Sequence, residues 1–293
     1  MLTEPQLSIL IPSYNYPEGV LRIVLPLLAE NRSDIEILIH DDSSDDRVEA
    51  CMKPLESHPG LTYVRNAPAL GAVWNWNHLI ERARGRYAML IHHDDFPLSE
   101  TFASDLLIEL EKNAWPDALI LSCLAYDVAR KAIRPCICNP IRSFIARRRP
   151  SYLFRRNVIG PPSVLVFRRE LFEGYDPELK WLVDVEGYFR FLKTRTRRLF
   201  FSRLMMVSST GLPDAISTTI RGSAKEIADA ELAYIAAKLP ETKNLTYGCL
   251  FEKMLWMTIK TTSLLSSTLM PPPSYSEVRR RDRLERERMI DAA

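Results

Sequence analysis

The sequence predicts an α/β protein with a doubly wound, mostly parallel sheet, helices on both faces and a small helical extension at the C-terminal end. Three observations predict this class. Short apolar runs alternate with segments of helical spacing, the connections between them are short, and several apolar runs end in polar or acidic residues. Strands that alternate with helices in this way form parallel sheets through crossover helices.

Four apolar runs in the first hundred residues have the length of strands that are buried on both faces. We expect these strands at residues 7–12, 35–39, 61–64 and 87–91. Apolar residues recur at helical spacing between them, so we expect helices at residues 19–30, 47–57 and 72–84. Pro97 follows the fourth run, and we expect it to end strand pairing there because proline lacks a backbone N–H.

Beyond Pro97 the alternation is less regular. We expect strands at residues 118–124 and 163–167 and helices at residues 99–112, 181–192, 223–238 and 247–265. Residues 135–150 have no periodicity and are basic. Ser223 and Glu226 have the spacing of a capping box that opens a helix. Residues 276–290 are rich in arginine and glutamate, so we expect a solvated helix or a disordered tail that buries little.

The length of 293 residues suits one large domain with an appendage. We divide the chain into a main α/β domain at 1–215, a helical extension at 216–270 and a charged tail at 271–293. The net charge is only +2, but residues 130–203 hold 18 Lys and Arg against 6 Asp and Glu. This stretch favours anions, which could be a nucleotide diphosphate, a lipid phosphate, an anionic membrane surface or nucleic acid, unless it is simply an exposed basic face.

Cysteine usage and hydropathy bear on the compartment. The five cysteines form neither a zinc-binding pattern nor a disulfide framework, which indicates reduced thiols in a cytoplasmic protein. The N-terminus lacks a basic region followed by an apolar one, and no apolar run reaches the roughly 18 residues of a membrane span. We therefore expect neither secretion nor a membrane-spanning helix.

Acidic side chains follow two of the predicted strands. Asp41 and Asp42 follow residues 35–39, and Asp94 and Asp95 follow residues 87–91. Ligands bind at the carboxyl ends of strands in open parallel sheets, and paired carboxylates there can hold Mg²⁺ or Mn²⁺. The alternative is a solvated turn that caps the next helix. The chain contains no Gly-x-Gly and no Gly-Lys-Ser/Thr, which excludes the dinucleotide fingerprint and the phosphate loop.

The order of several short blocks is more specific than any one of them. They are Pro12 to Asn15, Asp41 to Asp45, Gly71 with Asn77, Gly85 to Tyr87, His93 to Asp95, Asn157 to Ser163, Phe167 to Arg169 and Leu182 to Glu186 with Arg190. Over about residues 7 to 200 the chain resembles the inverting family-two glycosyltransferases of the GT-A fold, especially bacterial enzymes that extend surface polysaccharides.

The resemblance implies a role for particular residues. Those expected at the nucleotide are Pro12, Ser13, Tyr14, Asp42, Asn77 and Asp94. Asp95 matches the metal ligand and Asp184 the catalytic base. Residues expected on the acceptor or donor-sugar side are His93, Ser163, Arg169 and Glu186. From the residues alone, Asn77 could equally be a helix residue that bonds backbone, and Asp184 could cap a helix or pair with Arg190.

Three positions depart from the common family pattern. Ser43 stands where glycine is usual, His92 and His93 precede the acidic pair where small or apolar residues are usual, and Val183 replaces an acid before Asp184. None of these changes removes a matched carboxylate.

The resemblance implies a metal-dependent, inverting transfer from a nucleotide-diphosphate sugar to a glycan or lipid-linked glycan, in O-antigen-like or capsule-like polysaccharide biosynthesis. Mg²⁺ or Mn²⁺ would neutralise the departing diphosphate, and one carboxylate base would take the proton of the attacking hydroxyl. We expect a cytoplasmic enzyme, with peripheral association at the inner face of the membrane and no nucleic-acid partner.

Two other readings stay open. One is a nucleotide-binding or scaffold subunit of the same fold that has lost turnover, which the unusual Ser43, His93 and Val183 keep alive. The other is a nucleic-acid-binding protein that uses the basic middle of the chain, although the acidic strand ends argue against it. The sequence does not specify the donor sugar, the nucleotide base, the acceptor or the linkage.

Overall fold

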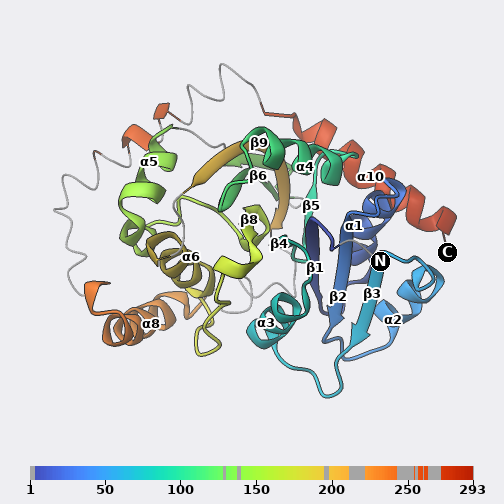
Figure 1. Ribbon diagram of the computed structural model, residues 1–293, viewed down its shortest axis with the longest axis horizontal. Helices are drawn as coiled ribbons and strands as arrows, with labels where there is room; N and C mark the ends of the chain where they lie inside the picture. The colour runs from blue at the N-terminus through green and yellow to red at the C-terminus, as the bar shows by residue number, and fades with distance from the viewer. Residues whose placement is uncertain are drawn as a thin grey trace.

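The computed structural model describes residues 4–127, 130–136, 140–194, 198–210, 222–242, 254, 257–259, 261–262 and 272–292. These residues form an α/β fold around one curled sheet, with strand order β3-β2-β1-β4-β8-β6-β9-β5 and β7 paired to β6 (Figure 1). The predicted α/β class is therefore confirmed.

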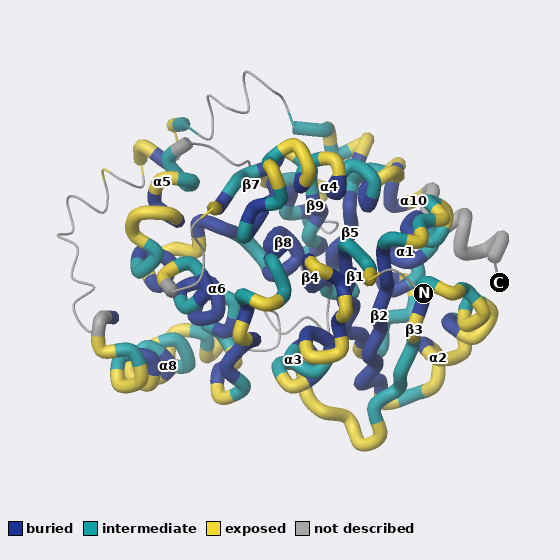
Figure 2. Tube along the Cα trace, in the orientation of Figure 1, coloured by how far each residue is buried: buried dark blue, intermediate teal, exposed yellow. Residues whose placement is uncertain are grey.

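The first part of the fold is the expected parallel, strand–helix alternation. Its elements are β1 (Leu7–Ser13), α1 (Pro17–Ala29), β2 (Ile35–Asp41), α2 (Arg47–Met52), η1 (Lys53–Leu55), β3 (Leu61–Arg65), α3 (Ala72–Arg82) and β4 (Tyr87–Leu90). Strands β3, β2, β1 and β4 pair in parallel. Every residue of β1, β2 and β4 is buried, as continuous apolar strands in a parallel sheet require (Figure 2).

The second part of the sheet is mixed. Its elements are β5 (Asp95–Pro97), α4 (Phe102–Lys112), β6 (Ala118–Asp127), β7 (Ala132–Cys136), α5 (Pro140–Arg148), η2 (Pro150–Phe154), η3 (Pro162–Val164), β8 (Leu165–Arg168), η4 (Arg169–Leu171), α6 (Val183–Thr194) and β9 (Leu199–Thr210). Strand β8 runs antiparallel to both β4 and β6, whereas β9 runs parallel to β6. This antiparallel step decides which side chains reach the acidic end of β4.

The structure differs from the sequence expectations at three places in this part. A short strand that was not expected, β5, precedes Pro97: it pairs with β9 at the end of the strand order and has Pro97 as its last residue, where proline is tolerated. The described residues among 135–150 are not irregular, since they hold the end of β7 and all of α5. The long strand β9 was not anticipated; its apolar residues are interrupted by Ser202 and Arg203, and its pairing with β6 contains a register shift.

The C-terminal elements are α8 (Ala224–Lys238), η5 (Pro240–Thr242) and α10 (Tyr275–Ala292). Helix α8 forms as expected, but the Ser223 side chain makes no capping hydrogen bond. A capping box forms instead at the start of α10, where Ser274 N donates to Glu277 Oε2 at 2.6 Å and Glu277 N donates to Ser274 Oγ at 3.3 Å.

Helix α10 packs against α1, so the expectation of a tail that buries little was wrong (Figure 1). Val278, Arg281 and Asp282 are buried at positions that share one helix face. The abundance of charge hid this short buried stripe.

Several expectations lie outside the described residues. They include the boundary at 215/216, most of the helix expected at 247–265, and the environments of Cys138 and Cys249. The division of the chain into domains stays a prediction. Within the described ranges, no helix combines the length and apolarity needed to cross a membrane.

Candidate functional site

The candidate site lies where the carboxyl ends of β1, β2 and β4 meet. Because these strands are parallel, Ser13 pairs with Asp41 across β1 and β2, and Leu10 pairs with Leu90 across β1 and β4. The loops that follow all three strands therefore begin at the same edge of the sheet.

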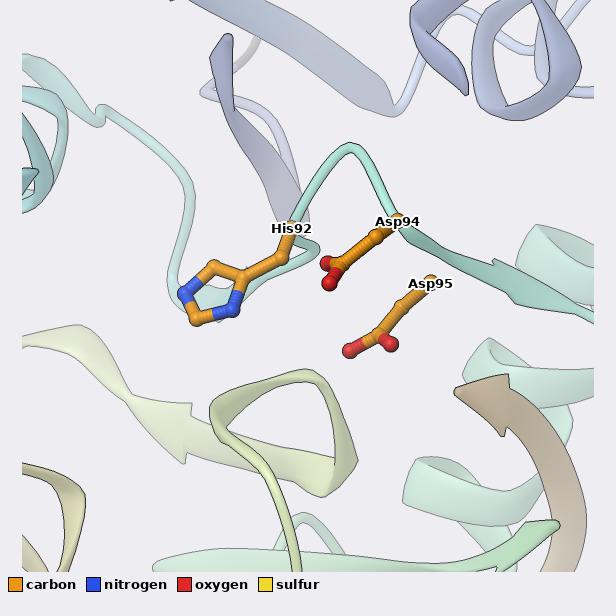
Figure 3. Close-up of side chains that lie close together, drawn as sticks. All are labelled: His92, Asp94 and Asp95. Carbon is orange, nitrogen blue, oxygen red and sulfur yellow. The ribbon is translucent and has the colours of Figure 1, made fainter. Parts of the chain in front are cut away.

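The loop between β4 and β5 presents three side chains with metal-ligating atoms. One ligand atom from each of His92, Asp94 and Asp95 lies within 4.8 Å of the others. Figure 3 shows the carboxylates of Asp94 and Asp95 pointing in the same direction, with the imidazole of His92 to one side. The sequence placed Asp94 and Asp95 in this site, and His92 joins them.

Asp95 is buried, with 2 % of its surface exposed. Burial raises its pKa to about 8, the negative charge of Asp94 adds to the rise, and hydrogen bonding from Ser163 and the charge of Arg22 lower it. A carboxylate that is this costly to ionise is stabilised by a cation, which makes the position suited to a divalent ion.

Ser163 supports both ends of the acidic loop. Its Oγ donates a hydrogen bond to Asp95 Oδ2 and accepts one from His92 N at 3.2 Å. Strand pairing explains this placement: β8 is antiparallel to β4 with Val166 opposite Met89, so Ser163 lies level with His92. The structure therefore places the predicted Ser163 beside the Asp95 carboxylate.

The imidazole of His92 packs against the side chain of Trp76. Its ring centroid is 4.6 Å from that of Trp76, and burial lowers its pKa to about 4, so it is neutral at physiological pH. Its Nε2 atom is buried without a hydrogen-bond partner among the described residues. A neutral imidazole beside two carboxylates is a donor set that fits Mg²⁺ or, because it includes imidazole, better fits Mn²⁺.

His93 faces the other way, toward the loop after β1. Its Nδ1 atom lies 3.3 Å from the carbonyl oxygen of Pro12, and its ring meets that of Tyr16 edge-on at 5.8 Å. Gly19 approaches so closely that a Cβ there would lie 2.1 Å from the His93 carbonyl oxygen. His93 thus contacts the predicted nucleotide-side loop and is not part of the cluster of His92, Asp94 and Asp95.

Asp42 organises the loop that follows β3. Its carboxylate accepts hydrogen bonds from Asn66 Nδ2 at 2.7 Å, Leu70 N at 3.0 Å and Gly71 N at 2.8 Å. Gly71 has a φ of 86°, a backbone conformation that glycine adopts at little cost. Asp42 therefore shapes the wall of the expected base site, and direct contact with a base stays a prediction.

The loop after β1 is tied to the loop after β2. Ser43 Oγ accepts a hydrogen bond from Asn15 N at 2.8 Å, and Ser44 N donates to Asn15 Oδ1 at 2.9 Å. The hydroxyl at Ser43 thus does work that glycine could not do. Next to these hydrogen bonds, Tyr14 is 47 % exposed. Ser13 Oγ is buried with no hydrogen-bond partner in the described part of the chain.

Asp184 lies at the second residue of α6. Its Oδ2 atom accepts a hydrogen bond from Asn157 Nδ2 at 2.8 Å, and its Oδ1 atom accepts one from Val185 N at 2.9 Å. Burial raises its pKa to about 6, and these two hydrogen bonds partly offset that rise. A half-buried carboxylate with this pKa is ionised near neutral pH and still basic enough to accept a proton.

Two buried tyrosines lie beside Asp184. The Tyr188 hydroxyl donates to the carbonyl oxygen of Gly160 at 3.3 Å, and burial raises its pKa, with the charges of both Asp184 and Asp95 adding to the effect. Tyr175 is also buried, and its hydroxyl has no hydrogen-bond partner among the described residues. Tyr188 therefore lies within electrostatic reach of both acids of the site.

Glu186 does not face a sugar site in this structure. It is fully buried and bonds Arg190 through both oxygens, at 2.6 Å and 2.9 Å. Arg190 also donates to the carbonyl oxygen of Gly174 at 2.8 Å. The acidic partners of Arg190 are therefore Glu186, one helical turn before it, and Glu173 at 3.7 Å, and the expected ion pair with Asp184 is not among its contacts.

Asn77 binds backbone. Its Oδ1 atom accepts from Tyr175 N at 2.7 Å, and its Nδ2 atom donates to the carbonyl oxygen of Tyr175 at 2.8 Å. Of the two readings of Asn77, these contacts support the structural one. The residue fixes the approach to α6, and a contact with nucleotide stays a prediction.

Arg169 lies at the opposite edge of the sheet, so its expected place on the acceptor side was wrong. Because β8 is antiparallel to β4, Arg168 pairs with Tyr87 at the amino end of β4. Arg169 follows it and donates from Nε to the carbonyl oxygen of Gly85 at 2.9 Å. The sequence could not reveal the direction of β8.

Two contributors to the site were not assigned from the sequence. Asn157 belongs to a matched block, but its contact with Asp184 depends on the fold. Arg22 lies in α1, with 4 % of its surface exposed, and its NH2 atom is 3.4 Å from the carbonyl oxygen of Asp94. A single arginine in the middle of an amphipathic helix gives no local signal for such a role.

Comparison with known proteins agrees with this geometry. The sequence profile of glycosyl transferase family 2 matches residues 8–176. An uncharacterised protein of Mycobacterium tuberculosis (strain CDC 1551 / Oshkosh), MT1568, is 26% identical over 207 residues. That match covers 64% of this chain and 62% of the relative, so the chain spans less than two thirds of the relative's length.

Solved structures share the fold. S. aureus TarS 1-349 in complex with UDP-GlcNAc aligns with a TM-score of 0.60 and 12% identity, covering 98% of this chain and 81% of that one. Mannosyltransferase PcManGT from Pyrobaculum calidifontis, in complex with GDP-Man and Mn²⁺, aligns with a TM-score of 0.56 and 14% identity, covering 94% and 79%. At these identities the likeness is one of fold.

Proposed function

The chain belongs to glycosyl transferase family 2, and we propose that it moves a sugar, with inversion, from a nucleotide diphosphate to a hydroxyl of a glycan or lipid-linked glycan. One observation carries the proposal. A single segment, residues 157–163, contacts both acids. Asn157, at one end of the segment, donates a hydrogen bond to Asp184, and Ser163, at the other end, donates one to Asp95. This shared support favours Asp184 as a base and Asp95 as a metal ligand that act in the same site.

The donor would lie over the carboxyl ends of β1, β2 and β4. The loop closed by Asp42 and the loop after Ser13 would bind the nucleoside, in the place where ligands bind in open α/β sheets. The two comparison structures are complexes with UDP-GlcNAc and with GDP-Man, which supports the same class of donor for this chain.

Asp95, with Asp94 and His92, would hold Mg²⁺ or Mn²⁺. One ligand atom from each of these residues lies within 4.8 Å of the others, and this clustering and the raised pKa of Asp95 support the assignment. When bound, the ion supplies Lewis-acid stabilisation of the charge that develops on the departing diphosphate.

Asp184 would be the general base. As the acceptor oxygen attacks the anomeric carbon, its O–H proton passes to the Asp184 carboxylate, and the bond from that carbon to the diphosphate oxygen breaks. One displacement on the face opposite the leaving group inverts the anomeric centre. Since Glu186 is engaged by Arg190, Asp184 is the acid of α6 that is available for this step.

The acceptor side carries an unusual charge. Residues 140–156 contain six arginines and no acidic residue, and this stretch leads directly into Asn157. Arg148, Arg149 and the aromatic Phe144 are exposed. We extend the proposal to an acceptor that carries phosphate, as a lipid-linked glycan does, and to peripheral association with an anionic membrane during polysaccharide biosynthesis. The free thiols of Cys51 and Cys123 agree with a reducing compartment, which for this proposal is the cytoplasm.

Thermal stabilisation by nucleotides tests the donor site. UDP, GDP, dTDP and CMP would each be added with and without Mn²⁺ or Mg²⁺; a ligand at about a hundred times its dissociation constant stabilises by roughly 2.7 kcal/mol. We expect one diphosphate to raise the melting temperature only with metal, and Asp95→Asn to remove that metal dependence. The nucleotide that responds then defines the sugar donors for a product assay.

The same proteins separate an enzyme from an inactive subunit. Transfer of a radiolabelled sugar that is lost in Asp184→Asn, with nucleotide binding retained, supports the enzyme. Metal-dependent nucleotide binding without turnover over a panel of donors and phosphate-bearing acceptors supports the scaffold reading instead.

A further inference from the structure

The C-terminal helix α10 reaches the candidate site through one buried arginine. Arg22, in α1, donates from NH1 to Asp282 Oδ1 at 2.9 Å, and both side chains are largely shielded from solvent, with 4 % and 11 % exposed. The two residues are 260 positions apart. This ion pair joins α10 to the helix that begins beside the nucleotide-side loop.

The same guanidinium group contacts the segment that carries the metal-site acids. Its NH2 atom lies 3.4 Å from the carbonyl oxygen of Asp94, and its central carbon lies 4.1 Å above the centre of the Phe96 ring. Asp95 lies between Asp94 and Phe96 in the sequence. A guanidinium that stacks on one residue and bonds the backbone of another restrains the main chain around Asp95.

Other contacts fix α10 in place. Val278 is fully buried, Arg281 pairs with Glu100 at 3.2 Å, and the ring of Tyr275 lies 5.4 Å from that of Tyr126. Glu100 lies three residues after the end of β5. Helix α10 therefore contacts the chain just after the acidic segment, through Glu100, as well as Arg22 beside that segment. In Figure 1, α10, in red, lies along α1 at the edge of the sheet.

We propose that Asp282 and Arg22 are positioning residues: α10, through this ion pair, sets the placement of Asp94 to Phe96 and so the geometry of the divalent-cation site. The consequence for metal and donor binding rests on the function proposed above; the restraint on the segment does not. An arginine held by a carboxylate keeps one orientation, whereas the same arginine without its partner is a buried charge free to turn toward the other acids nearby.

Hydrogen exchange in the ligand-free, full-length protein tests the restraint. We expect Asp282→Asn to speed exchange of the backbone amides of residues 94–96 and 98 by about tenfold, because local opening becomes easier when a buried pair is broken; Pro97 has no amide hydrogen. Exchange over residues 275–283 reports whether α10 stays docked. Asp229→Asn is the matched control, since it removes the same chemical group from an exposed ion pair with Lys225 on α8.

Mn²⁺ affinity, measured by paramagnetic resonance, tests the consequence. We expect the Mn²⁺ dissociation constant to rise at least about threefold in Asp282→Asn, to be restored largely by Asp282→Glu and to be unchanged in Asp229→Asn. If the 94–98 amides exchange at the wild-type rate while α10 stays docked, the proposal is overturned.

Two further outcomes are decisive. A wild-type protein that binds no Mn²⁺, but whose 94–98 segment loosens in Asp282→Asn, supports the positioning role and removes the metal site from the proposed function. If Asp282→Asn does not fold, Arg22→Lys decides, because it retains the charge and loses the planar fork. Faster exchange at 94–98 in that variant supports the proposal, and wild-type exchange overturns it.

Discussion

Asn157 donates its side-chain amide to Oδ2 of Asp184 at 2.8 Å. The contact joins residues 27 positions apart, and it favours the ionised form of a carboxylate whose pKa burial raises to about 6. The Asn157 amide thus lowers the pKa of the carboxylate that we assign as the base. Its removal should change that pKa in a direction that can be measured.

We expect Asn157→Ala to raise the pKa of Asp184, because a hydrogen bond to the charged form is lost. The base works when deprotonated, so activity falls as the pH drops through its pKa, and the acid limb of kcat/KM should move to higher pH. The pH profile measures this shift. Asn113→Ala is the control, since that amide donates to a helix carbonyl at the end of α4; an acid limb unmoved in Asn157→Ala would contradict the role.

We expect Asp184→Asn to lower the turnover number by about a hundredfold or more, the usual range for loss of a general base. It should not weaken the fold. The folded pKa of about 6 lies above the reference value of 3.8, so ionising Asp184 destabilises the folded state as the pH rises from about 4 to 6.

Removal of this buried charge gives a second expectation for Asp184→Asn. Denaturant unfolding at pH 7.5 should show a free energy of unfolding about 1 kcal/mol higher than that of the wild type, an amount discounted for the partial exposure of Asp184. The difference should vanish near pH 4. A variant that is inactive because it is less stable at pH 7.5 would argue for a structural role only.

We expect Ser163→Ala to weaken Mn²⁺ and metal–nucleotide binding several-fold, because Asp95 loses a charge-assisted hydrogen bond and His92 N loses its acceptor. Calorimetric titration with Mn²⁺ and the nucleoside diphosphate measures the change. Ser122→Ala is a matched control, as Ser122 is equally buried and donates to the Ser202 carbonyl in another part of the sheet. Equal effects from both variants would refute a specific role for Ser163.

We expect Asp42→Asn to destabilise the fold by about 1–3 kcal/mol and to weaken nucleotide binding. Asparagine offers one acceptor oxygen, whereas Asp42 accepts from Asn66, Leu70 and Gly71 through two. Chemical denaturation and nucleotide titration measure the two effects. Asp45→Asn, at an exposed position in the same loop, should leave both near the wild-type values.

We expect Arg169→Gln to leave the acceptor KM unchanged, because Arg169 lies at the sheet edge opposite the acids. The double variant Arg148→Gln and Arg149→Gln should raise the KM for a phosphate-bearing acceptor, with a smaller effect on a neutral one and a weaker salt dependence. Steady-state kinetics with both acceptors measure this. An acceptor KM that responds to Arg169 and not to the basic stretch would reverse the assignment.

Local sequence determined the first half of the fold and the centre of the site. The apolar strands that end in acid need no distant partner to be recognised, because a buried strand and its polar end are properties of neighbouring residues. Once β1, β2 and β4 are parallel, Asp42, Asp94 and Asp95 must meet at one edge. The order of the matched blocks added Asp184 and Ser163 to this set.

The tertiary structure decided what strand direction and helix docking control. The antiparallel run of β8 brought Ser163 to Asp95 and took Arg169 to the far edge, and the direction of a four-residue strand is not written in its own residues. Likewise, only docking of α10 on α1 turned Asp282 into the partner of Arg22. Such contacts between residues far apart depend on the packing of whole elements, so the sequence could supply the groups but not their pairing.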